Sequence, residues 1–162
     1  MRHWGIGIMS FREKMLWVSL IAETAIWGSY LFDVGWLLSR GVVNAEQALG
    51  GFIRSVIWLV VVEVVAAVIL AIMAPSDANA PEDARDRDFA ATASVPAYNL
   101  LSLLVVGVMI ATPAIVTAAP RWLSGDRETI YAVVIGNALL LALVLAHTVR
   151  TTAQLWRYRR EG

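Results

Sequence analysis

The sequence predicts an all-α integral membrane protein in which four helices cross the bilayer as an up-down-up-down four-helix bundle. Hydrophobic residues make up 59% of the 162 residues, only 16% are charged, and the mean hydropathy is +0.66. A soluble domain is usually about half apolar and a quarter charged. Four apolar stretches are each long enough to cross a hydrocarbon core of roughly 30 Å. We therefore expect a single transmembrane domain over residues 1–162.

The first two spans are expected over residues 15–38 and 52–74. The first is apolar except for Glu23, Asp33 and several hydroxyl side chains, and it is too long for the apolar region of a cleaved signal peptide. The second has Glu63 as the single charged residue of its apolar core and ends before Pro75. A short connection at residues 40–51 separates the two spans.

The third and fourth spans are expected over residues 95–119 and 129–149. A polar cytoplasmic loop at residues 76–94 precedes the third span, and Pro81 within it is typical of a short helix start. Pro113 predicts a kink inside the third span, and Pro120 is expected to end it. Asp126 is a candidate N-cap for the fourth span. A basic tail, residues 150–162, follows.

The distribution of lysine and arginine predicts the orientation of the spans. Nine basic residues fall in the N-terminal segment, the central loop and the tail, against four near the other two connections. Because basic residues concentrate on the cytoplasmic side, both termini are expected inside the cell. The expected location is the bacterial cytoplasmic (inner) membrane.

Three segments carry a resemblance: MSFREKMLW at residues 9–17, DARDRDF at 83–89 and the run at 137–162. They are similar to an uncharacterised bacterial family of small four-span membrane proteins, a domain of unknown function. The resemblance implies the four-span fold and no activity. Ala90 and Ala91 depart from that family's charged continuation, and Glu23 and Glu63 are not part of its pattern. If Met9 is the family's start, residues 1–8 are an extension or Met1 is an alternative start.

Each span places one polar side chain at a similar depth. At a rise of 1.5 Å per residue, Glu23 lies about 12 Å and Glu63 about 16 Å from the cytoplasmic ends of their spans. Ser102 and Asn137 come at about 10 and 18 Å by the same rise. We expect these four residues to form one polar layer in the inner half of the membrane. Burial and mutual repulsion disfavour a second negative charge, so the two acids should share one proton or both be neutral.

Three interpretations of this layer stay open. In a proton or cation relay, Glu23 and Glu63 carry the charge while Asn137 and Ser102 support them by hydrogen bonds. As a structural feature, neutral glutamates bond across helices and stabilise packing by roughly 0.6–2 kcal/mol per contact. As an interface, the glutamates pair between subunits of an oligomer, for which we expect a homodimer.

His147 lies one turn before the expected end of the fourth span, near the depth of Asn99. Helix rise places it about two turns too shallow to join Glu23 and Glu63 in a metal site. Two histidines and no cysteine also make a poor set of ligands for zinc or haem. We expect no metal, no cofactor and an interfacial position for His147.

An aromatic stripe follows Glu23 at helical spacing, with Trp27 and Tyr30 on the same face as the acid. Together with Asn99 and His147, these side chains are candidates to support a bound ligand. Ordinary packing between helices explains the same pattern.

The central loop carries alternating charges on Asp83, Arg85, Asp86, Arg87 and Asp88. The spacing lacks the glycine and the final glutamate of a calcium-binding loop. It fits either a solvated helix start or a docking surface for a cytoplasmic partner. The basic tail suits anionic lipid headgroups, and a net charge of zero argues against nucleic acid.

Two hypotheses of function follow. No hydrolase elbow, phosphate loop or HExxH pattern occurs, so we expect no enzyme. The first hypothesis is a structural or regulatory membrane protein that acts by interaction with lipid, a second copy of itself, or a cytoplasmic or membrane protein partner. The alternative is a small transporter or proton/cation-coupled carrier that uses Glu23 and Glu63. Carboxyl groups that face each other inside the bundle favour the carrier, and carboxyl groups that face apart exclude it.

Overall fold

Four long helices make up the computed structural model, which describes residues 9–75 and 84–161. They are α1 (Phe11–Ser39), α2 (Ala45–Met73), α4 (Ala84–Trp122) and α5 (Arg127–Glu161). Each helix is long and apolar enough to cross a membrane. The prediction of an all-α protein with four candidate membrane spans is confirmed.

Side-chain caps determine where α1 and α2 begin. Ser10 Oγ accepts a hydrogen bond from the Glu13 amide at 3.2 Å. Asn44 Oδ1 accepts one from the Gln47 amide at 2.9 Å. Each cap satisfies an amide that the first helical turn leaves without a partner. The Asn44 cap also explains a difference from the predicted boundaries, because residues 45–51 belong to α2 and not to the connection.

Asp126 caps α5 as the sequence predicts, since its Oδ2 accepts a hydrogen bond from the Thr129 amide at 2.8 Å. This backbone hydrogen bond lowers the pKa of the Asp126 carboxyl. The cap therefore stabilises the fold above the unfolded-state pKa of about 3.9, and this contribution is lost as the pH falls through the lower folded value. In Asp126→Asn the capping oxygen remains and the titration is removed, so the acid-induced fall in melting temperature should become smaller. An unchanged pH profile of the melting temperature would contradict this role.

The helices extend beyond the predicted spans at most other borders as well, except that α2 ends at Met73. The expected loop helix and the third span form one continuous helix, α4, of 39 residues. The basic tail continues α5 up to Glu161. The expected helix start at Pro81 lies outside the described residues.

Pro120 lies inside α4, which ends only at Trp122, so the prediction that this proline ends the span is wrong. A proline within a helix has no amide hydrogen for the carbonyl four residues earlier, which here is Val116. The Tyr131 hydroxyl of α5 donates a hydrogen bond to that Val116 oxygen at 3.1 Å. A side chain of the neighbouring helix thus satisfies the freed carbonyl, which is how membrane helices tolerate proline.

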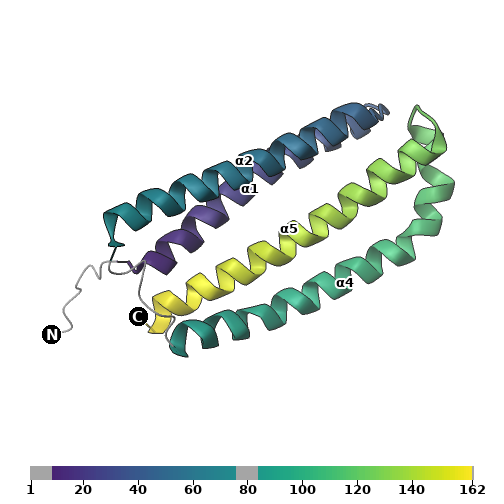
Figure 1. Ribbon diagram of the computed structural model, residues 1–162. Helices are drawn as coiled ribbons and strands as arrows, with labels where there is room; N and C mark the ends of the chain where they lie inside the picture. Colours follow the sequence, from purple (N-terminus) through teal and green to yellow (C-terminus); the bar gives the residue numbers. More distant parts are fainter. Residues whose placement is uncertain (1–8, 76–83, 162) are drawn as a thin grey trace.

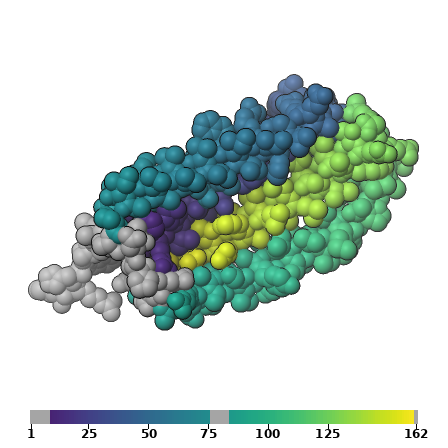
Figure 2. All heavy atoms as spheres, viewed as in Figure 1, coloured from purple at the N-terminus to yellow at the C-terminus, as the bar shows by residue number. Residues whose placement is uncertain are grey.

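The helices pack as two hairpins, α1 with α2 and α4 with α5, and the main contact between the hairpins joins α1 to α5. Within the described ranges the backbone of α4 lies close to that of α5 alone, and the Arg12–Asp86 ion pair joins it to α1. Accordingly α2 and α4 lie on opposite edges of the molecule, as Figures 1 and 2 show. We call the end that holds Phe11, Ala84 and Glu161 the terminal end. The opposite end, with residues 40–44 and 123–126, is the turn end (Figure 1).

A backbone contact at the turn end ties the two hairpins together. The Gly41 carbonyl accepts a hydrogen bond from the Ser124 amide at 2.8 Å. Gly41 has a φ of 74°, and a Cβ at this position would lie 2.8 Å from the Trp122 carbonyl oxygen. Glycine is therefore required here by both the backbone conformation and the close approach.

Buried side chains gather in two places. A core between α1, α2 and α5 contains Trp27, Tyr30, Val34 and Val133. At the terminal end, Phe89 and Leu155 are almost fully buried between α4 and α5. Most large apolar side chains of α2 and of the middle of α4 are exposed instead. Lipid is as apolar as these side chains, so a membrane helix does not need to cover them with protein.

Candidate functional site

The deepest ionisable contact joins α1 to α5. Glu23 is buried, and its Oε1 lies 3.5 Å from His147 Nε2. The His147 side chain is 46% exposed, so the pair reaches from the helix interface to the surface of the molecule. A carboxyl and an imidazole at this separation can share or exchange a proton.

The prediction that His147 lies too shallow to reach Glu23 is wrong. That prediction placed the membrane end of the fourth helix at Val149, whereas α5 continues to Glu161. Glu23 lies twelve residues from the start of α1 at Phe11, and His147 lies fourteen residues from the end of α5. Because both helix ends lie at the terminal end, the two side chains reach the same level.

Glu63 of α2 lies beside this pair, so three helices contribute to the site. Ser19 Oγ, one turn before Glu23, donates a hydrogen bond to Glu63 Oε1 at 3.1 Å. Glu23 and Glu63 are also close enough for their charges to interact. The two predicted acids are therefore neighbours on either side of α1, with Glu23 at its contact with α5 and Glu63 at its contact with α2. We call Glu23, Glu63 and His147 the acid–histidine cluster.

The cluster combines two acidic side chains with one histidine. Two negative charges repel each other strongly where little water is present, and one imidazolium can offset only one of them. Among the described residues, no group of three acidic, histidine or cysteine side chains is arranged to hold a metal ion, and this includes the cluster.

The other two members of the predicted polar layer do not reach the cluster. Asn137 Nδ2 donates to the Val133 carbonyl of its own helix at 2.8 Å, and its buried Oδ1 has no hydrogen-bond partner among the described residues. Its amide lies near the Tyr30 hydroxyl. Ser102 belongs to α4, whose backbone in the described part of the chain lies close to α5 and not to α1 or α2. The layer thus contains two acids and one histidine, with the amide lying further toward the turn end.

The aromatic side chains Trp27 and Tyr30 follow Glu23 along α1 in the direction of the turn end. Trp27 and Tyr30 are buried, and their rings meet at 6.0 Å in an edge-to-face arrangement. Phe52 of α2 completes the group at 5.5 Å from Trp27. Tyr30 and Asn137 also line an apolar groove of about 370 Å³ between α1, α2 and α5. Asn99, the other candidate for ligand support, is exposed on α4.

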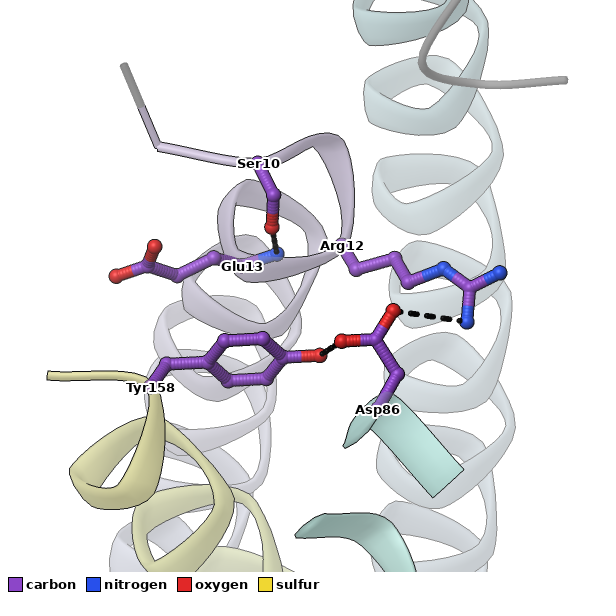
Figure 3. A network of polar contacts seen from close by, with 5 residues as sticks. All are labelled: Ser10, Arg12, Glu13, Asp86 and Tyr158. Atoms are coloured by element: carbon purple, nitrogen blue, oxygen red, sulfur yellow. Dashed lines mark hydrogen bonds and ion pairs between the residues drawn. The ribbon is translucent and has the colours of Figure 1, made fainter. Parts of the chain in front are cut away.

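A second polar network lies at the terminal end (Figure 3). Asp86 of α4 receives an ion pair from Arg12 of α1 at 3.3 Å and a short hydrogen bond from the Tyr158 hydroxyl of α5. Burial raises the pKa of Tyr158, and its hydrogen bond to Asp86 raises it further. Tyr158 therefore stays protonated and serves as a donor over the physiological pH range.

The charged side chains of the central segment, residues 83–88, lie in different surroundings. Asp86 is engaged as described, and Asp88 Oδ2 lies 3.5 Å from Arg157 Nη1. Arg85 packs over the Phe89 ring with its guanidinium carbon 5.1 Å from the centroid. Arg87 is exposed, and Asp83 lies outside the described residues. Sequence alone does not predict the contacts that Arg12, Phe89 and Tyr158 make across helices, because their partners in the other helices lie about 70 residues away along the chain.

A groove of about 250 Å³ runs from this network between α1, α4 and α5 as far as Ser19, the donor to Glu63. Its polar lining residues are Arg12, Ser19, Asp86, Gln154 and Tyr158, and Phe11, Met15 and Leu16 make up the apolar part. Ser19 therefore lies between the groove and the acid–histidine cluster, and aromatic side chains pack on the other side of the cluster.

The chain was compared with protein-family models, with curated proteins and with solved structures, and none of the three comparisons found a match. The resemblance of the three sequence segments to a bacterial family stays a prediction.

Proposed function

We propose that this protein is a small proton-coupled carrier, with the acid–histidine cluster as its proton-binding site. The contact between Glu23 of α1 and His147 of α5, beside Glu63 of α2, carries this proposal. Ionisable side chains are costly inside a membrane, and they usually mark a proton or ion pathway. A site shared by three helices also suits a carrier, because protonation changes the attraction between the helices that hold it.

The groove between α1, α4 and α5 supports an access route for protons from the terminal end. Ser19 lies at the inner end of this groove and is bonded to Glu63. On the other side, the packed rings of Trp27, Tyr30 and Phe52 separate the cluster from the turn end. One open side and one closed side are the requirement for alternating access.

The orientation of the protein in the membrane is part of the proposal. With the up-down-up-down order of spans, Arg12, Asp86 and Tyr158 share the terminal end, and the nine basic residues of that side favour the cytoplasm. Both termini would then face the cytoplasm of a bacterial inner membrane. We also propose that the chain belongs to the resembled family and forms a homodimer.

Infrared spectroscopy of the purified protein tests the proton site without a known substrate. At neutral pH the wild type should show the carbonyl band of a protonated carboxyl group, because Glu23 and Glu63 lie together. Glu23→Gln or Glu63→Gln should abolish that band, and Glu46→Gln, an exposed acid of α2, should retain it. A wild-type spectrum without the band would overturn the proposal.

A flux measurement in liposomes tests coupling. A potassium diffusion potential drives protons inward, and a pH-sensitive dye reports their uptake. The Glu23→Gln, Glu63→Gln double variant should lose the flux while it keeps its melting temperature within a few degrees, since glutamine preserves size and hydrogen bonding. Glu46→Gln serves again as the control.

A regulatory interaction protein is the second candidate function. The Asp88 side chain is 71% exposed at the start of α4, and Arg87 beside it is exposed as well. These charges favour a surface for a cytoplasmic partner. If wild type and the double glutamine variant give equal flux, the carrier is excluded and this second function takes its place.

A further inference from the structure

A second groove, of about 360 Å³, lies between α1 and α2 near the turn end. Ser29 and Asp33 form its rim on α1, and Arg54 and Trp58 form its rim on α2. Each of these pairs is spaced by four residues, so its two side chains lie on one face of their helix. The groove therefore has a carboxylate on one side and a guanidinium on the other.

The two charges are available to a ligand. Asp33 and Arg54 are both exposed, and neither forms an ion pair or a hydrogen bond with the rest of the described chain. Ser55 of the groove floor is buried, and its hydroxyl likewise has no protein partner among the described residues. Opposite charges that share a groove without pairing suit a ligand that carries both signs.

The floor of the groove is closed by a tight helix contact. A Cβ added to Gly51 would lie 3.2 Å from two carbons of the Tyr30 ring. The two helices thus meet directly at this point, and a ligand can enter only from the outer side of the hairpin. The groove is a trough on the surface of the protein and does not lead to the acid–histidine cluster.

The depth of the groove corresponds to a membrane interface. Asp33 comes 19 residues after Lys14, which is about 28 Å of helix and close to the thickness of the hydrocarbon core. Arg54 lies one turn before Ile57, where the apolar run of α2 begins. Trp58 beside it suits the same interface, since tryptophan concentrates at headgroup level.

We propose that this groove binds the headgroup of a phospholipid with a primary ammonium group, such as phosphatidylethanolamine. Arg54 would hold the phosphate through charge-assisted hydrogen bonds, and Asp33 would accept hydrogen bonds from the ammonium. The acyl chains would lie along the exposed apolar side chains of α2. An anionic headgroup without an ammonium would leave Asp33 unpaired and repelled, which makes the site selective.

Native mass spectrometry of the detergent-purified protein tests the proposal. With equal amounts of phosphatidylethanolamine and phosphatidylglycerol, the wild type should retain the former about tenfold more strongly, which is the order expected for one charge-assisted hydrogen bond. Asp33→Asn should remove the preference, and Arg54→Gln should weaken the binding of both lipids. Arg127→Gln and Glu128→Gln, exposed charges at the start of α5, are the matched controls.

Three outcomes overturn the proposal: equal retention of the two lipids by the wild type, an unchanged preference in Asp33→Asn, or full displacement of the lipid by soluble phosphoethanolamine. The last outcome would assign the site to a free zwitterion. Arg54→Lys provides a second variant if Arg54→Gln fails to fold, because it keeps the charge and removes the bidentate geometry. It should retain binding at a reduced level.

Discussion

Replacement of Phe89 by alanine is expected to lower the free energy of unfolding by about 3–5 kcal/mol, the usual cost of truncating a buried phenylalanine. Phe89 is 1% exposed, and its ring meets Tyr158 edge-to-face with 5.2 Å between centroids. Arg85 and Arg157 also pack over the ring. The substitution therefore removes the centre of the contact between the start of α4 and the end of α5.

Denaturation by increasing amounts of an ionic detergent, followed by circular dichroism, measures this effect. Phe32→Ala is the matched control, because the Phe32 side chain is 69% exposed on α1. It should cost less than about 1 kcal/mol, as is typical of surface substitutions. Similar losses in the two variants would show that Phe89 has no special place in the fold.

The second large effect is expected for Trp27→Ala in the aromatic group of α1. Trp27 is 8% exposed and packs against Tyr30 and Phe52. We expect a loss of about 3 kcal/mol, at the lower end of the range for soluble cores, because lipid and not water surrounds the separated helices. Trp36→Ala on the same helix removes a side chain that is 52% exposed and should cost clearly less.

Trp27→Ala also has a functional consequence that stability alone does not produce. The aromatic rings separate the acid–histidine cluster from the turn end, so their loss should raise the proton permeability of liposomes under an imposed potential. Trp36→Ala should leave the permeability at the wild-type level. If Trp27→Ala lowers the melting temperature and leaves the permeability unchanged, the rings only pack the core and do not close the route.

The network around Asp86 should stabilise the terminal end. It joins α1, α4 and α5 through one carboxylate, in which Arg12 supplies a charge and Tyr158 a neutral donor. Because burial and the Asp86 hydrogen bond both raise the pKa of Tyr158, alkaline conditions do not remove the donor before the pH passes the usual range of a tyrosine. The network can therefore hold three helix ends together over the physiological pH range.

The amino-acid sequence by itself determined the number of helices, their apolar character, the cap at Asp126 and the presence of Glu23 and Glu63 inside two of them. These features depend on residues close together along the chain, where helix rise and hydrophobicity are sufficient. The lengths of the helices were harder to predict from the sequence. For example, Tyr131 of α5 satisfies the carbonyl that Pro120 frees, and α4 therefore continues past this proline.

Only the tertiary structure decided which polar side chains meet. Lipid does not drive helices together as water does, so hydropathy carries no information on which helix faces pair. The offset between α1 and α5 brings His147 to Glu23, and the position of α4 on the outer edge keeps Ser102 away from both acids. Small shifts along a helix axis change such contacts completely, because one turn moves a side chain by about 5.4 Å.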